Sequence, residues 1–470
     1  MKGLTVASLG LAWLGPRRAV VRASVALVVM LVVALLLPLT GAVADAGQEM
    51  TLAQQLRRQA LPLDLADEAS LAPLLRHCDA ARLILLGDAT HGSEEFYRLR
   101  RQLSLALMAH QRVDFLVLEA DAHSCLALDA YVRLQPGAPA SAIAALRQMP
   151  ARLGWVWQTR ELALLLEDLR CHNARLPAGQ RVALYGMDLL DYDGALRQLQ
   201  TRLGPLPALR QVQECFGVGA DPDRYVRALL AGTADCQTEL AALRPLLPSA
   251  EQLFVQWRGA ETLTRLRLLL GLQAAEAYYR RQLQDSAAAW NLRVRHFADQ
   301  LRLLLRHHGP ESRALVWAHN THVGDARFTA MPDWGMVSLG QLLRQEWGPA
   351  AVFLLGQTGA LGQVRASRDW GAADEVLTLA PPRADSVEAL LLASGLATGL
   401  WLFAAAEAAS PFDAWRDQRA VGVVYRPERD ATDNYLPSRL SRRYDALVFF
   451  RQLQPTTLLE GQLLENRAWP

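Results

Sequence analysis

The feature that most constrains the fold is a series of short, continuous apolar runs along the chain. Each run is five to seven residues long, and its hydrophobicity does not alternate, which is typical of strands covered on both faces. Helical stretches such as Glu94–His110, Arg160–Asn173 and Gly194–Leu203 separate several of the runs. This order predicts an α/β fold with a largely parallel sheet covered by helices on both faces. The predicted strands are Arg82–Gly87, Val113–Glu119, Val182–Asp188, Ala314–His319, Ala351–Gly356, Val421–Tyr425 and Ala446–Phe450.

A long stretch without such a run lies between about residues 206 and 306. It is dense in Leu, Ala, Arg and Gln at helical spacing, which predicts a helical insertion or subdomain within the α/β domain.

The first 44 residues have the pattern of a secretory signal peptide. Residues 1–22 are basic, residues 23–44 are almost entirely apolar, and Ala42-Val43-Ala44 supplies the small residues that a signal peptidase reads. Cleavage before Asp45 would release residues 45–470 as an exported domain, periplasmic or secreted. The apolar run is also about long enough, at ~20 residues, to remain as a membrane anchor. Both alternatives stay open, and contact with a membrane is expected only through an uncleaved leader.

The basic residues of this leader account for the small positive charge of the chain. The whole chain carries 49 Lys and Arg against 47 Asp and Glu, and removal of residues 1–44 leaves 45 basic and 47 acidic side chains, a net charge of −2. A nearly neutral domain offers no electrostatic basis for binding nucleic acid. A chain that is 51% hydrophobic and 20% charged also excludes extended disorder.

Five scattered cysteines, none in a CxxC pair, exclude a zinc ribbon and a thioredoxin-type motif. In an exported protein, Cys215 and Cys236 are the expected disulfide pair. The odd count leaves at least one thiol unpaired within the chain.

Polar and charged side chains, which are costly to bury in a hydrophobic sheet, lie at the downstream ends of four predicted strands. In open α/β sheets the carboxyl edge binds ligands, because the loops and helix N-termini there face a common crevice. Four separate segments that deliver acids and histidines to one edge therefore predict an active site. The residues concerned are Asp88, His91, Glu119, Asp188, His319 and His322.

Each of these residues alone also has a structural explanation. His91 could be a turn residue before a capped helix, and Glu119 could form a structural ion pair with Arg100. Asp188 could equally cap the segment that follows it. The convergence of several such residues on one edge is what favours a site.

Other motifs are absent or do not match. His319 and His322 share one side only if their segment turns helically, and they do not form the HExxH zinc motif. There is no GxSxG nucleophile elbow, no P-loop and no GxGxxG fingerprint after a strand. The remaining histidines are expected at the surface, with His296 as the exception.

Several segments together resemble the erythromycin esterase family, which includes macrolide esterases and uncharacterised exported or succinoglycan-associated proteins. They occur in order from about Arg82 to Phe450 and read LLGDATHGSEEF, FLVLEAD, WVWQTRE, ALYGMD, WNLRVRHFA, VWAHNTHVGD and SLGQLL. The spacing of the family's catalytic His, of an Arg nine positions on and of a Glu twenty-eight positions on falls on His91, Arg100 and Glu119. Its later pair of histidines falls on His319 and His322.

One position departs from the family pattern. The family usually has Glu three residues before the histidine, and this chain has Asp88. A carboxylate one methylene shorter would lie roughly 1–1.5 Å further from a fixed partner, and a misplacement of that size can cost ~100-fold in rate. The resemblance therefore implies an ester or lactone hydrolase but leaves activity on macrolides open.

The mechanism that the resemblance implies is base catalysis without a cofactor. His91 removes a proton from a water that attacks the carbonyl, and Glu119 or Asp88 orients the imidazole. Positive charge or hydrogen bonds for the developing oxyanion would come from Arg100, His319 and His322.

Two alternatives use the same residues. A divalent metal such as Zn²⁺ could activate the water, and its ligands would be His91, Glu119, His319 and His322. The chain could also be a binding or polysaccharide-assembly factor that retains the edge without turnover. In every case the expected partner is a small-molecule ester, a lactone or an acylated sugar.

Two further segments are expected beside the site. The helical insertion should pack over the edge, where Asn291 and Arg293 would bind substrate or, alternatively, form a helix packing face with Arg293 in an ion pair. The segment Gly324–Gly335 has the composition of a mobile loop and would act as a lid.

Overall fold

A computed structural model describes residues 51–110, 113–150, 153–217, 224–246, 259–403 and 410–459. The chain divides into two compact units, Met1–Gln55 and Leu56–Pro470. Of the first unit, residues 51–55 are described and are helical. The predicted leader, residues 1–44 with the apolar run 23–44, lies outside the described residues. The second unit contains the sheet and all the residues of the predicted site.

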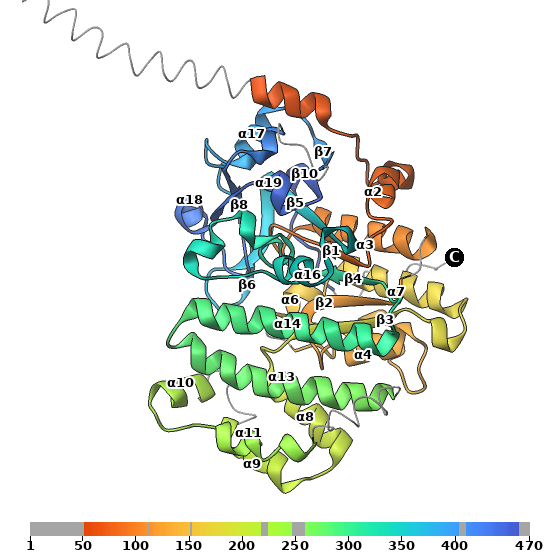
Figure 1. The fold of residues 1–470 in the computed structure, drawn as a ribbon, viewed down its shortest axis with the longest axis vertical. Helices are drawn as coiled ribbons and strands as arrows, with labels where there is room; N and C mark the ends of the chain where they lie inside the picture. Colours follow the sequence, from red (N-terminus) through yellow and green to blue (C-terminus); the bar gives the residue numbers. More distant parts are fainter. Residues whose placement is uncertain are drawn as a thin grey trace, which may run out of the picture. The chain divides into compact units, whose positions relative to one another are not determined.

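The second unit is built around a mostly parallel sheet (Figure 1). Among the described residues this sheet has eight strands, in the order β3-β2-β4-β1-β5-β10-β7, with β6 paired to β5. The pairs β10–β7 and β5–β6 are antiparallel, and the others are parallel. Strands β8 and β9 form a separate antiparallel pair. The strands are β1 Leu83–Leu86, β2 Phe115–Asp121, β3 Ala183–Asp188, β4 Ala314–Trp317, β5 Val352–Ser367, β6 Asp374–Thr378, β7 Thr398–Leu402, β8 Arg416–Arg419, β9 Tyr435–Ser438 and β10 Ala446–Leu453.

Helices cover this sheet on both faces, as its continuous apolar strands require. In β1, Ile84 and Leu86 share a core with Leu99 and Leu103, and Leu85 on the opposite face is also fully buried. Helices α14 and α16 lie side by side and contact β3 and β5 (Figure 1). The α-helices are α2 Ala72–His77, α3 Glu94–His110, α4 Leu126–Val132, α5 Ala142–Leu146, α6 Gly154–Trp157, α7 Arg160–Ala174, α8 Tyr192–Leu203, α9 Pro207–Phe216, α10 Arg224–Leu230, α11 Gln237–Ala241, α13 Ala260–Gln282, α14 Ser286–His308, α15 Asn320–Val323, α16 Leu339–Trp347, α17 Val387–Ala393, α18 Asp430–Asp433 and α19 Leu440–Arg443.

The α/β architecture predicted from the sequence is confirmed, and one predicted strand is wrong. The run Val421–Tyr425 is a loop. Its apolar side chains are buried at both ends because it packs between other segments: the N–H of Val421 donates to the Ala89 carbonyl, and that of Tyr425 to the Ser367 carbonyl. Hydrophobicity here reflects burial without a strand ladder. Strands β6 to β9 were not predicted.

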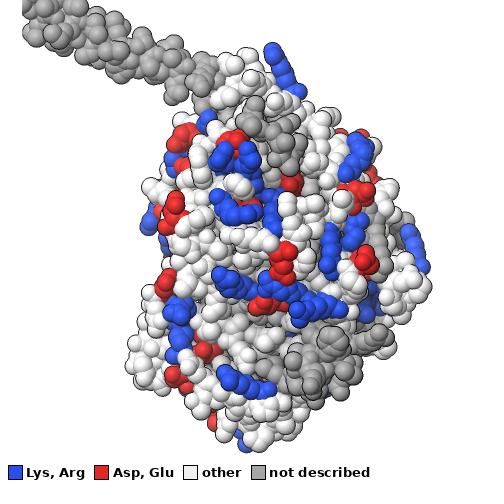
Figure 2. Space-filling model, viewed as in Figure 1, with Lys and Arg blue, Asp and Glu red and all other residues white. Residues whose placement is uncertain are grey.

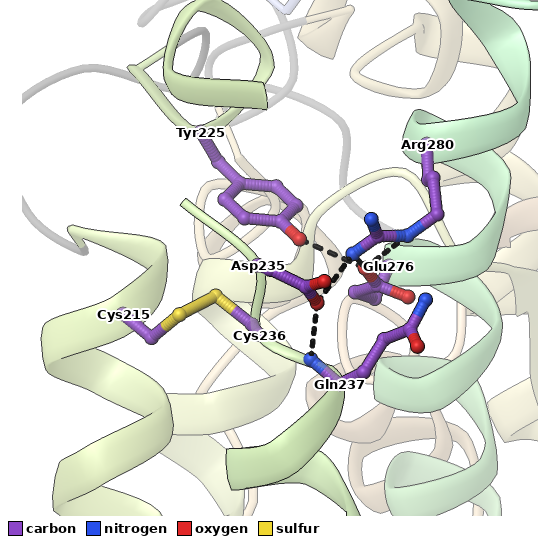
Figure 3. The surroundings of a disulfide bond; sticks show 7 residues. All are labelled: Cys215, Tyr225, Asp235, Cys236, Gln237, Glu276 and Arg280. Carbon is purple, nitrogen blue, oxygen red and sulfur yellow. Dashed lines mark hydrogen bonds and ion pairs between the residues drawn. A yellow bond between two sulfur atoms is a disulfide. The ribbon is translucent and has the colours of Figure 1, made fainter. Parts of the chain in front are cut away.

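The predicted helical insertion is confirmed. Helices α9, α10, α11, α13 and α14 occupy the region, and α14 continues two residues beyond Arg306. The insertion residues Leu209, Phe216 and Leu272 belong to a hydrophobic cluster that they share with α8, for example with Leu196. The predicted disulfide between Cys215 and Cys236 is present, and beside it the Tyr225 hydroxyl donates to Glu276 (Figure 3).

Surface charge and hydropathy agree with the composition. On the face drawn in Figure 2, basic and acidic side chains are interspersed. None of the helices among the described residues combines the length and the apolar character that crossing a bilayer requires.

Candidate functional site

The polar residues at the ends of four strands come together at the carboxyl edge of the sheet. Strands β3, β2, β4 and β1 are parallel neighbours, so the loops that follow them lie side by side. The pairing of β2 with β3 shifts register between Leu118 and Asp121, around Glu119. Irregularities of this kind re-aim a side chain at the rim of a sheet.

His91, Asp88 and Arg100 form a buried chain of contacts. Oδ2 of Asp88 lies 3.4 Å from Nδ1 of His91, longer than an ordinary hydrogen bond, and 2.7 Å from Nη2 of Arg100. Asp88 and Arg100 are fully buried, and His91 is 7% exposed. The Arg100 guanidinium also lies over the rings of Tyr97, at 4.5 Å, and Trp317, at 4.9 Å. One carboxylate and two aromatic faces therefore compensate its charge.

Glu119 is the centre of a second group. Its Oε1 accepts a hydrogen bond from Nη2 of Arg293 at 2.9 Å and lies 3.2 Å from Nε2 of His322. Its Oε2 accepts the backbone N–H of His319 at 2.8 Å. The alternative ion pair between Glu119 and Arg100 is not formed, because each guanidinium has a different carboxylate partner.

Arg293 joins the ends of β2 and β3. Its Nε and Nη2 donate to the two oxygens of Asp188 at 2.9 and 2.6 Å, while Nη2 also reaches Glu119. Asp188 additionally accepts the backbone N–H of Leu189, whereas the helix that follows is capped by Asp191. Asn291 lies elsewhere on the rim: its side-chain amide donates to the Gly335 carbonyl and accepts the Val337 N–H. Both functional atoms of Asn291 thus hold a loop, and its contact with substrate stays a prediction.

His319 and His322 share one side of the segment because it turns helically, as the spacing required. His319 caps α15, and its Nδ1 accepts the backbone N–H of Thr321. The neutral imidazole of His319 therefore carries its proton on Nε2. Its ring centroid lies 5.3 Å from that of His91, which connects the two groups of residues.

The pKa values of His91 and His319 are shifted in opposite directions. Burial lowers the pKa of His91, but the Asp88 carboxylate and Glu119 raise it by more, so the net pKa lies above its usual value. Burial, reinforced by the nearby His91, lowers the pKa of His319 to about 4. At neutral pH His319 is a neutral hydrogen-bonding group, while His91 can exchange a proton.

The two carboxyl groups remain ionised despite their burial. Burial raises the pKa of Asp88, but Arg100, His91 and His319 together lower it by more, so the net pKa is lowered. Burial likewise raises the pKa of Glu119, and His322 and then Arg293 lower it well below its usual range. Each carboxylate is therefore a fixed negative charge beside a histidine.

The metal-dependent alternative finds no preformed site. Within the part of the chain that the structure describes, no group of three or more His, Cys, Asp or Glu side chains is arranged to hold a metal ion. Of the four residues predicted as ligands, Glu119 pairs with His322 and Arg293, and His91 faces Asp88. The imidazole of His319 contacts Thr321.

One contact of the site could not be predicted from the sequence. The indole of Trp290, on α14, stacks on His322 with ring centroids 4.3 Å apart and planes 7° apart. Trp290 belongs to a segment that resembles the family, but nothing in the neighbouring sequence indicates that its ring contacts a histidine 32 positions later.

The segment Gly324–Gly335, predicted to act as a lid, contains the short 3-10 helices η4 Ala326–Phe328 and η5 Met331–Trp334. Its movement as a lid stays a prediction.

Buried histidine–carboxylate groups thus lie at the carboxyl edge of a mostly parallel sheet, where α/β proteins of this class bind their ligands. The chain belongs to the erythromycin esterase family, whose model matches residues 108–453. This membership supports a hydrolase of that family. The matched residues include Glu119, Asp188, His319 and His322, whereas Asp88, His91 and Arg100 precede them.

Three solved structures share the fold. A Bacillus cereus protein has a TM-score of 0.66 at 18% identity, covering 88% of this chain and 99% of its own. A succinoglycan biosynthesis protein gives 0.64 at 18% identity, with 87% and 98% covered. A histidine-to-asparagine variant of the erythromycin esterase EreC, in its open conformation, gives 0.57 at 17% identity, with 87% and 98% covered.

Proposed function

We propose that this chain is an exported hydrolase that cleaves an ester or a lactone by water attack, with His91 as the base. The observation that carries the proposal is the buried chain His91–Asp88–Arg100 beside His319. A histidine whose one nitrogen faces a fixed carboxylate can take a proton on its other nitrogen, and the carboxylate stabilises the imidazolium that forms.

The other residues divide the remaining tasks. His319, neutral and protonated on Nε2, would donate a hydrogen bond to the oxyanion that develops on the carbonyl. Arg100 would act through Asp88, because its charge is buried behind that carboxylate. Glu119 would fix His322 and Arg293, whose side chain keeps 15% exposure through which it could contact substrate.

Export is part of the proposal. A disulfide persists in an oxidising compartment, so the Cys215–Cys236 bond supports a periplasmic or secreted location together with the predicted leader. The candidate substrates are small-molecule esters, lactones and acylated sugars. Two of the related structures are named for erythromycin esterase and for succinoglycan biosynthesis, which keeps both lactones and acylated sugars in this set.

The test is a substrate screen with matched histidine variants. Residues 45–470 would be incubated with para-nitrophenyl esters, erythromycin, simple lactones and acylated sugars, and acid release would be measured. His91→Ala should lose at least ~100-fold in turnover, the lower range for a general base, without loss of thermal stability. His110→Ala, which alters an exposed histidine at the end of α3, should behave as wild type.

Two outcomes would overturn the proposal. Full activity of His91→Ala would exclude it as the base. Thermal stabilisation by a ligand that the protein never consumes would instead identify a binding factor.

A further inference from the structure

Trp290 connects two parts of the rim that are distant in sequence. On one side its indole stacks on His322, at 4.3 Å and 7°. On the other side its Nε1–H donates to the Val337 carbonyl at 2.7 Å. The neighbouring Asn291 makes two more hydrogen bonds with the same segment, at 2.7 and 2.9 Å. Two consecutive residues of α14 thus hold segment 331–337, and one of them also touches a histidine of the site.

The stack with Trp290 is one of the contacts that orient the His322 ring. Phe297 contacts the ring as well, with centroids 5.1 Å apart. His322 is 2% exposed, and its Nε2 lies 3.2 Å from Glu119 and 3.3 Å from Arg293. Its Nδ1 has no hydrogen-bond partner among the described residues, so no bond on that side fixes the ring. Its orientation therefore depends on the two aromatic neighbours as well as on Glu119 and Arg293.

Segment 331–337 is the second half of a closed loop. The loop begins and ends at one junction, where the Ser338 hydroxyl donates to the Gly324 carbonyl and accepts the Ala326 N–H. Its first half is tied to β9 by the hydrogen bond from the Ala330 N–H to the Pro437 carbonyl. Loops closed in this way are compact units that often have functional roles. The second half meets α14 through Trp290 and Asn291, and it also packs on β9, where Met331 shares a small buried cluster with Leu436.

We propose that Trp290 is a positioning residue that couples the docking of segment 331–337 to the orientation of His322. While the segment is docked, the Val337 carbonyl holds the indole flat on the imidazole, and Nε2 of His322 faces Glu119. When the segment lifts, the indole loses its anchor and the imidazole is free to rotate. The inference rests on the proposed function. If the protein hydrolyses an ester, His322 would take its place in the site only while segment 331–337 is docked over the bound ester.

The experiment measures the exposure of His322 directly, so it does not require turnover. Diethyl pyrocarbonate modification of His322 would be located by peptide mass spectrometry, alongside amide hydrogen exchange of segment 331–337. Asn291→Ala removes the two hydrogen bonds that the Asn291 side chain makes with segment 331–337, and it leaves the direct contacts of His322 unchanged. Because a net hydrogen bond corresponds to a factor of roughly five, both rates should rise on the order of tenfold or more.

The second step asks whether Trp290 carries the effect. Trp290→Leu should itself raise His322 modification, and adding Asn291→Ala should then change it by less than about twofold, because the coupling is already lost. Trp290→Phe, which retains a stacked ring without the anchor, should lie between wild type and Trp290→Leu and provides a variant that preserves the packing. Trp415→Leu, which removes an indole that is 57% exposed, should match wild type.

Three results would overturn the coupling. The first is unchanged His322 modification in Asn291→Ala although the segment exchanges faster. The second is an equal effect of Asn291→Ala with and without Trp290. The third is unchanged amide exchange of the segment in Asn291→Ala.

A kinetic arm separates this inference from the proposed function. With para-nitrophenyl acetate, Trp290→Phe should lower kcat and leave KM nearly unchanged, because it disturbs the assembled edge more than substrate contact. If the wild-type protein does not hydrolyse this ester, the proposed function is contradicted for this substrate. The rate of His322 modification still tests the coupling between Trp290 and segment 331–337, because it does not require turnover.

Discussion

Replacing Asp88 by Asn is the most direct perturbation of the proposed base. The side chain keeps its size but loses a charge that lies 3.4 Å from His91 and 2.7 Å from Arg100. Two unit charges 3.4 Å apart attract by about 5 kcal/mol at an effective dielectric constant near 20. Repulsion between Arg100 and the imidazolium is present with Asp or Asn at position 88, so it does not change this difference. At about 1.36 kcal/mol per factor of ten, kcat should fall about 10³- to 10⁴-fold.

The pH dependence should change as well. The Asp88 carboxylate raises the pKa of His91 against the effect of burial. Because a base acts in its unprotonated form, wild-type kcat/KM should rise with pH through a value above the usual 6.5 of histidine. In Asp88→Asn the pKa of His91 falls, so this acid limb should move to lower pH.

The assay is a pH–rate profile on any ester that the wild type hydrolyses. Asp88→Asn also leaves Arg100 buried without a carboxylate, which costs about 3–5 kcal/mol of a typical total of 5–15. The profile should therefore be recorded at a temperature where near-UV circular dichroism shows the variant folded. Asp88→Glu retains the charge and should keep the acid limb in its wild-type place. An Asp88→Asn enzyme with the wild-type limb and kcat would refute the role of the pair.

Further predictions concern metal, pH, the disulfide and the leader. Prolonged dialysis against EDTA should leave turnover unchanged, and activity that disappears and returns with Zn²⁺ would favour the metal mechanism. His296 and His319 should each lower the free energy of unfolding as pH drops from about 6.5 to about 4, because the folded state keeps them neutral with pKa values of about 4 while the unfolded chain protonates them near 6.5. Asp121, whose pKa burial raises to about 7, contributes with the opposite sign, so the histidine contribution is read from the difference between a variant and wild type. Denaturant titrations of His296→Gln should show a shallower fall, and an equal slope would contradict this. Replacing Cys215 and Cys236 by Ser should cost about 3 kcal/mol of stability, given their separation of 21 residues, whereas Cys171→Ser should cost little. Lys2 is the only lysine of the chain, so an amine-reactive reagent should add a single label to a domain cleaved before Asp45 and further labels to an uncleaved chain.

The parts of the fold that could be predicted from the sequence are those where burial and strand formation coincide. Leu83–Leu86 and Ala314–Trp317 are buried on both faces because they lie inside the sheet, and their apolar runs marked them. The run Val421–Tyr425 is as apolar but packs as a loop, and β8, with the sequence RDQR, pairs as a strand although it is entirely polar. Hydrophobicity reports burial, and only the tertiary neighbours decide whether a ladder forms.

The site follows the same division. Strand ends in a parallel sheet share an edge, so the convergence of His91, Glu119 and His319 could be predicted from topology alone. Pairing within the edge could not, because several cations and acids compete at similar distances and the β2 irregularity re-aims Glu119. The hydrogen bonds of Asn291 could not be predicted either. Its position beside the site was predicted, but its partners Gly335 and Val337 belong to a loop from another part of the chain.

The strand order has a consequence for how the protein is made. Strand β4 lies between β2 and β1 and is parallel to both, yet it is synthesised more than 190 residues after β2. A nascent chain that ends before Ala314 holds β1 and β2 without the strand that joins them, with exposed edges that can pair wrongly. Asp88 and His91 are thus translated early but meet His319 only when the ribosome has delivered about two thirds of the polypeptide. Assembly of the site is a late event in the life of the chain, because a chain that stops before Ala314 lacks β4 together with His319 and His322.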